Sequence, residues 1–292
     1  MPSSGDIAAA ADVVSRDDGM GITHASMAVR RKSRGKFRRK LRQLGLVMAA
    51  AIPIQGLKKG ILRYAFGYHI GRNVRIGAAY LDCERLTIGD HTHVSSGTAV
   101  LGCLDVEIGS YVLIGPLNLI RGGDIVRIGD YAQILRMNVI NAIPDNDCTN
   151  HPDPTFILGY GSVVTAEHRI DFTDRVTIGR CTTFGGRNSS IWTHNRRSGA
   201  GVEIGDYCYI GSEIRMAPGT RIPHCCVVGI GAVVTKPMLH PYSLIGGVPA
   251  KRIRGIDEDD KELIFGKTRK DLPDESYPLI PDDGTLIEDQ VE

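Results

Sequence analysis

The feature that most limits how this chain can fold is an apolar side chain at every sixth position. Between residues 204 and 234 it recurs without a gap, at Ile204, Ile210, Met216, Ile222, Val228 and Val234. Neither the 3.6-residue period of an α-helix nor the two-residue period of a strand explains this spacing. A repeating six-residue unit is therefore present, and extended repeats of this kind predict a solenoid.

The same unit extends upstream in groups of three, and the groups begin at Ile88, Ile108, Ile128, Leu158 and Ile178. Twenty of the twenty-one framed positions from 88 to 234 are apolar, and only Ser190 breaks the pattern. Glycine often follows the apolar residue, where a missing side chain lets the backbone turn. Three short strands then close a triangular coil, and coils stack as parallel strands about 4.8 Å apart. The predicted fold class is all-β, a parallel β-helix.

The repeat Ile/Leu/Val-Gly-x-x-x-x resembles that of the left-handed β-helix acyltransferases, and only this resemblance supplies the left hand, because right-handed crossovers are the general rule. The segments 229–236 ("GIGAVVTK") and 242–256 ("YSLIGGVPAKRIRGI") resemble the C-terminal half of the galactoside, maltose and polysaccharide O-acetyltransferases. The resemblance covers roughly residues 70–256. It implies a homotrimer that uses acetyl-CoA or another acyl-CoA and no metal.

The implied reaction is acyl transfer to a hydroxyl of a sugar, a glycolipid or a polysaccharide precursor. N-acylation of an amino sugar or a small amine on the same scaffold is the alternative. A zinc hydratase on this scaffold needs two histidines five residues apart, and none of the nine histidines has that spacing. A scaffold without catalytic activity is a third alternative.

Two long insertions interrupt the repeat, at residues 141–156 and 191–203. Both follow the third unit of a coil, so both loops are expected to leave the β-helix at one edge. One coil separates them, which places their roots about 10 Å apart. Because regular coils are chemically bland, the site is expected here.

His194 lies in the second loop, beside the single Trp192. A hydroxyl is too weak a nucleophile to attack a thioester unless a base removes its proton, and imidazole does this well at neutral pH. The resembled family has its general base at this place, so His194 is the predicted base, without an acyl-enzyme. An acceptor should hold its other ring nitrogen. Asp145, Asp147 and Glu203 are the candidates for that role.

The predicted acceptor-binding residues lie around the same two loops, although polar turns and corner caps explain several of them equally well. They are Asn138, Asn141, Asp145, His151 and Trp192. The resemblance also implies the residues that contact coenzyme A, with the cations meeting its phosphates. These are Ser212, Ile230, Thr235, Lys236, Lys251 and Arg254.

The two ends of the chain have opposite charge. Residues 30–42 hold nine Lys/Arg, whereas residues 257–292 hold thirteen acids and four bases. We expect a disordered basic arm at 1–36, a short helical cap at 37–69, the β-helix at 70–256 and an extended acidic tail at 257–292. The basic arm beside an apolar segment also suggests peripheral contact with anionic lipid, whereas nucleic-acid binding is not expected.

The expected compartment is the cytoplasm, with the protein peripheral at the inner face of the membrane if lipid is bound. The seven cysteines lack a C-x-x-C spacing and are expected to be reduced and mostly buried.

Overall fold

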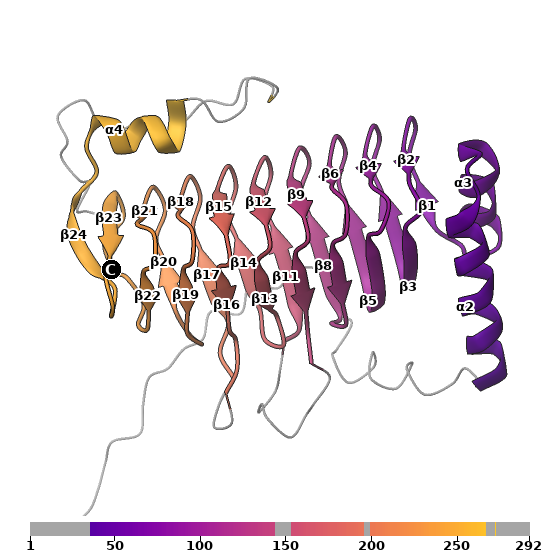
Figure 1. Ribbon diagram of the computed structural model, residues 1–292, viewed down its shortest axis with the longest axis horizontal. Helices are drawn as coiled ribbons and strands as arrows, with labels where there is room; N and C mark the ends of the chain where they lie inside the picture. The colour runs from indigo at the N-terminus through magenta and orange to yellow at the C-terminus, as the bar shows by residue number, and fades with distance from the viewer. Residues whose placement is uncertain (1–35, 144–152, 196–198, 267–271, 273–292) are drawn as a thin grey trace, which may run out of the picture. The chain divides into compact units, whose positions relative to one another are not determined.

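The computed structural model describes residues 36–143, 153–195, 199–266 and 272 (Figure 1). The chain divides into two units, Met1–Lys40 and Leu41–Glu292. The described part of the first unit is the beginning of helix α2 (Lys36–Ala51). The second unit holds the β-helix. The predicted basic arm, apart from Lys36 at its end, and most of the predicted acidic tail lie outside the described residues.

Stacked parallel strands form the body of the second unit (Figure 1). One face is a ten-stranded sheet that contains β2 (Arg75–Ile76), β4 (His93–Val94), β6 (Leu113–Ile114), β9 (Gln133–Arg136), β12 (Val163–Ala166), β15 (Thr183–Arg187), β18 (Tyr209–Ile210), β21 (Val227–Val228), β23 (Ser243–Gly246) and β24 (Lys251–Gly255).

The other two faces belong to one fourteen-stranded sheet, because β3 (Tyr80–Ile88) and β5 (Ala99–Ile108) run through the corner between them. The second face continues with β7 (Leu119–Arg121), β10 (Val139–Asn141), β13 (Arg169–Asp171), β16 (Ser190–Ile191), β19 (Arg215–Met216) and β22 (Val233–Val234). The third has β1 (His69–Ile70), β8 (Ile125–Ile128), β11 (Thr155–Leu158), β14 (Val176–Ile178), β17 (Val202–Ile204) and β20 (Arg221–Ile222). The predicted all-β parallel β-helix of hexapeptide repeats is confirmed.

The sixth-position residues fill the interior, with one change of register. Ile191, and not Ser190, occupies the inward position of its coil: it is fully buried and pairs with Ile170 of the preceding coil. Ser190 pairs instead with the exposed Arg169. The coil contains an additional residue between Phe184 and Arg187, where the register with the preceding coil shifts: Val164 pairs with Phe184, and Ala166 pairs with Arg187. The predicted inward position of Ser190 is therefore wrong, and the aliphatic column is unbroken there.

A row of buried polar side chains runs inside the wall at the corner before the second face. The Asn138 amide donates to Asn118 Oδ1 at 3.1 Å and to Thr165 O at 2.9 Å. Its Oδ1 accepts from the backbone N–H of His168 at 2.9 Å. His168 is itself fully buried, and this burial lowers its pKa to about 4. These groups hold adjacent coils together and face no solvent.

Helices lie next to both ends of the β-helix. Leu46 of α2 and Leu62 of α3 (Gln55–Tyr64) join the same buried cluster as Ile70 and Ile76 of the first coil. At the other end, helix α4 (Glu258–Lys261) begins with a capping box at Asp257 and continues into the π-helical turn η1 (Glu262–Gly266). The predicted extended tail is therefore helical at its start. Among the described helices, none has the length and apolar character needed to cross a bilayer.

Candidate active site

The candidate site is built where β13 and β16 end at the same edge. Ile170 and Ile191 are register partners. The residues that follow them, Asp171 and Trp192, are therefore neighbours on adjacent coils at this edge. His194 pairs with Gly199 in an antiparallel bridge, and the Ala200 N–H donates to Thr193 O at 2.8 Å. The backbone at Thr193 and His194 is thereby held by the backbone of Gly199 and Ala200.

Asp171 holds the His194 ring. His194 Nδ1 lies 2.7 Å from Asp171 Oδ2. The same oxygen accepts from the Thr193 N–H at 3.1 Å and from its hydroxyl at 3.0 Å. Asp171 Oδ1 accepts from the Thr173 N–H at 3.1 Å and from its hydroxyl at 2.6 Å. The carboxylate is 5% exposed. It is therefore fixed on every side, as an orienting group requires.

This geometry selects the histidine tautomer. A carboxylate oxygen only accepts hydrogen bonds, so the proton of neutral His194 resides on Nδ1 and the lone pair on Nε2 is available as a base. The His194 side chain is 15% exposed, which leaves the ring accessible while most of it is desolvated. Chemically, the pair is arranged for general base catalysis supported by a buried carboxylate.

Asp171 was not among the carboxylates predicted to orient His194. Glu203 is half exposed and pairs with Arg221 at 3.4 Å, so its prediction as the orienting residue is wrong. Asp145 and Asp147 lie outside the described residues. Asp171 was missed because it belongs to a regular coil, 23 residues before His194. The signal that identifies it is stacking: it directly follows the inward residue one coil before the loop.

The predicted acceptor residues separate into three groups. Trp192 is 48% exposed beside His194, and half-buried Asn141 is the register partner of Asp171 on the neighbouring strand. Asn138, in contrast, is fully buried and hydrogen-bonded within the wall, so its predicted contact with an acceptor is wrong and it caps a corner. His151 and Asp145 lie outside the described residues.

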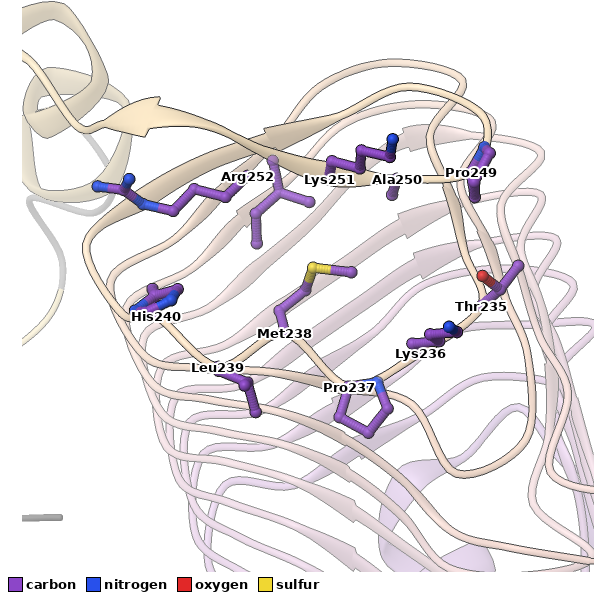
Figure 2. Close-up of a pocket in the computed structure, with 11 residues that line it drawn as sticks. Thr235, Lys236, Pro237, Met238, Leu239, His240, Pro249, Ala250, Lys251 and Arg252 are labelled. Atoms are coloured by element: carbon purple, nitrogen blue, oxygen red, sulfur yellow. The ribbon is translucent and has the colours of Figure 1, made fainter.

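Three of the predicted coenzyme A residues line a cavity of about 370 Å³ at the C-terminal end of the β-helix (Figure 2). They are Thr235, Lys236 and Lys251. Thr235 follows β22, which lies two strands from β16 in the sheet. The end of β22 is therefore about 10 Å from the end of β16, where the His194 loop begins. In Figure 2 the Met238 side chain points from the segment 235–240 toward strand β24. Arg252 and His240 also line the cavity, and the sequence did not single them out.

The other three coenzyme A predictions lie elsewhere. Ser212 and Ile230 follow β18 and β21, at the edge before the second face, whereas His194 lies at the edge after it. Arg254 is held by two carboxylates, Asp257 at 2.7 Å and Asp260 at 2.5 Å. These ion pairs raise the pKa of Arg254 and compete with a phosphate. A single chain therefore does not bring the six residues together.

The described residues contain no group of three or more His, Cys, Asp or Glu side chains placed to hold a metal ion.

Comparison with models of known protein families finds no match. Among curated proteins, the galactoside O-acetyltransferase of Escherichia coli (strain K12) is 27% identical over 119 residues, which are 39% of this chain and 58% of that protein. A chloramphenicol acetyltransferase of Escherichia coli is 46% identical over 71 residues, 24% of this chain and 33% of that protein. The chain thus spans less than two thirds of either relative.

Among solved structures, the UDP-N-acetylglucosamine acyltransferase from Campylobacter jejuni superposes with a TM-score of 0.51 and 17% identity, and the match covers 68% of this chain and 78% of that one. This similarity shows the fold. Together with the two curated relatives, it confirms the resemblance to the hexapeptide-repeat acyltransferases that the repeat and the C-terminal segments predict.

Proposed function

We propose that this protein transfers an acyl group from acetyl-CoA or another acyl-CoA to a hydroxyl of a sugar, a glycolipid or a polysaccharide precursor. The observation that carries the proposal is the Asp171–His194 pair, in which a buried carboxylate holds Nδ1 at 2.7 Å. Two relatives are acetyltransferases by name, and one of them acts on a galactoside. Their partial coverage leaves the acceptor of this chain to experiment.

The proposed mechanism is direct transfer. His194 Nε2 removes the proton of the acceptor hydroxyl while the oxygen attacks the thioester carbonyl. The tetrahedral intermediate collapses by breaking the C–S bond, and the thiolate of coenzyme A takes the proton from His194. Asp171 stabilises the imidazolium that exists between these two proton transfers. No side chain becomes acylated, so no nucleophilic cysteine or serine is needed.

Donor binding is proposed at the cavity of about 370 Å³. Lys236, Lys251 and Arg252 line it, and cations of this kind pair with the phosphates of coenzyme A. Apolar Met238 and Ile245 provide surface for the rest of the donor. Because Ser212 and Ile230 lie at another edge, a donor that contacts all of these residues needs two chains. This requirement supports a homotrimer with each groove between two subunits.

The test incubates the protein with acetyl-CoA and longer acyl-CoAs against a panel of glycans and amines, with products identified by mass spectrometry. We expect O-acylated product with wild-type protein and a decrease on the order of 10²–10⁴-fold with His194→Ala. His93→Ala is the matched control, because that exposed histidine lies on β4, outside the site. An unchanged yield with His194→Ala contradicts the assignment of the base. Products acylated only on nitrogen would support the amine alternative.

A further inference from the structure

Helix α2 presents apolar side chains on both of its faces. Leu46 and Ala49 are each 2% exposed and pack into the core of the β-helix. Leu41, Leu44 and Met48 are 60%, 58% and 63% exposed. A spacing of three and four residues places these three on one stripe along the helix. The inner face is therefore already used, and a second apolar stripe is left without a partner in the described chain.

The exposed apolar surface continues beyond α2. Ile54, in the connection to α3, and Leu57, in the first turn of α3, are also more than half exposed. Single exposed apolar residues are ordinary, whereas a concentration of them at one end of a domain indicates a binding surface. We call Leu41, Leu44, Met48, Ile54 and Leu57 the outer apolar surface.

The sequence around this surface has only one sign of charge. No aspartate or glutamate occurs between Asp18 and Asp82, whereas the same stretch holds 14 Lys and Arg. On the described part of α2, Arg38, Arg39 and Lys40 are exposed and directly precede Leu41. A segment this basic attracts anionic surfaces and repels copies of itself.

We propose that the outer apolar surface binds the surface of an anionic lipid bilayer. A helix with its apolar stripe in the acyl boundary and its basic residues at the headgroups satisfies both observations at once. Nucleic acid would pair with the basic residues but would leave the apolar stripe exposed to water. A second copy of the chain would cover the stripe and bring two strongly basic segments together. Because its inner face packs on the β-helix, α2 can offer lipid only the outer stripe and therefore lies parallel to the bilayer.

The first experiment measures flotation of the full chain with vesicles of phosphatidylcholine, with and without phosphatidylglycerol. We expect binding only to the anionic vesicles. Replacing Arg38, Arg39 and Lys40 by Gln should weaken that binding roughly a hundredfold, since each basic residue near the surface contributes about 1 kcal/mol. The combination Leu41→Glu, Leu44→Glu and Met48→Glu should abolish it.

The matched control adds the same charge elsewhere. Leu117, Met137 and Ile253 are exposed apolar residues of the β-helix, at 60%, 41% and 63%. Their combined replacement by Glu should leave flotation at the wild-type level. Equal loss in both triple variants would mean that added negative charge alone explains the effect, and would overturn the proposal.

A second experiment reports insertion directly and does not depend on disruptive variants. In a Trp192→Phe background, which removes the single native tryptophan, Leu44→Trp should show blue-shifted emission with anionic vesicles and quenching by brominated lipid. Leu117→Trp in the same background should show neither. If the Leu44→Trp variant floats with the vesicles but its emission is not blue-shifted, a different surface of the protein contacts the membrane. A vesicle-independent blue shift, with a changed oligomeric state in the Glu variant, would assign the stripe to contacts between copies. Either result overturns the proposal.

Discussion

His168 and His194 lie in consecutive coils of the β-helix, and their imidazole rings have opposite surroundings. His168 Nδ1 accepts from the Ser189 N–H at 3.1 Å, and its Nε2 lies 2.9 Å from the Thr165 hydroxyl. Both ring nitrogens are thus satisfied inside the wall. In His194, Nδ1 is held by Asp171 and the ring remains partly exposed. The two histidines consequently have opposite tautomers.

The difference shows what the interruption of the repeat provides. In the buried row of Asn118, Asn138 and His168, polar side chains complete hydrogen bonds between neighbouring coils and have no capacity left for a substrate. A loop at the edge lets the wall supply one partner and leaves the second nitrogen open. Substitutions in the structural wall and at the reactive edge should therefore have different effects.

The largest effect is expected from Asp171→Asn. An amide in place of the carboxylate offers an N–H to His194 Nδ1, which moves the imidazole proton to Nε2 and removes the base. We expect kcat to decrease on the order of 10²–10⁴-fold, with KM for acetyl-CoA unchanged. Steady-state kinetics measure both constants. Asp174→Asn is the matched control, since Asp174 caps the backbone N–H of Arg175 and does not contact His194. Equal activity in both variants would remove Asp171 from the mechanism.

The wall is tested by Ile134→Ala, which removes a fully buried side chain from a regular coil. Such truncations cost about 2–5 kcal/mol in the free energy of unfolding. Urea denaturation measures this loss. Reaction rates below the unfolding transition should stay near wild type. A rate decrease as large as that of Asp171→Asn would show that the wall and the reactive edge are not separable.

The buried histidine should make stability depend on pH. The pKa of His168 is about 4 because of burial, and it is about 6.5 in an unfolded chain. Unfolded protein therefore binds an additional proton between these values, so stability decreases as pH falls from about 6.5 to 4, by about 3 kcal/mol in total. His168→Asn should reduce this loss, because it extends the row formed by Asn118 and Asn138. Denaturation curves at pH 7 and pH 4.5 compare the two proteins, and identical pH dependence would count against this account.

The smallest effect is expected from Trp192→Ala. The indole is 48% exposed beside His194, and an aromatic contact with an acceptor contributes about 0.5–1.5 kcal/mol. We expect KM for the acceptor to rise by up to about tenfold, with kcat little changed. Trp192→Phe should retain most of the affinity. If kcat falls instead, Trp192 positions the loop and not the acceptor.

The repeat was sufficient to predict the β-helix because burial dictates every sixth residue, and almost every such position proved to be inward. The misassigned position, Ser190, precedes the true inward residue Ile191. One additional residue in that coil cannot be located from spacing alone, since Ser190 lies six residues after Phe184.

The site was predicted only in part. His194 stands out because it interrupts the repeat, whereas Asp171 and Asn138 occupy regular positions that carry no such signal. The corner of the coil that each residue occupies determines whether its side chain lies near the loop. Asp171 follows an inward residue at the edge of the loop, and Asn138 precedes one at the opposite edge.

The antiparallel direction of β24 affects how readily the protein aggregates through its strand edges. A column of parallel strands at constant spacing is also the geometry from which fibrils grow, and its last coil would template another molecule. β24 instead runs antiparallel to β23, with a register shift between Leu244 and Ile245. All five of its residues are exposed, and Lys251, Arg252 and Arg254 are cationic. An irregular, positively charged final strand is a poor pairing partner for a strand of another molecule, so the stacking of strands in this sheet ends within each chain.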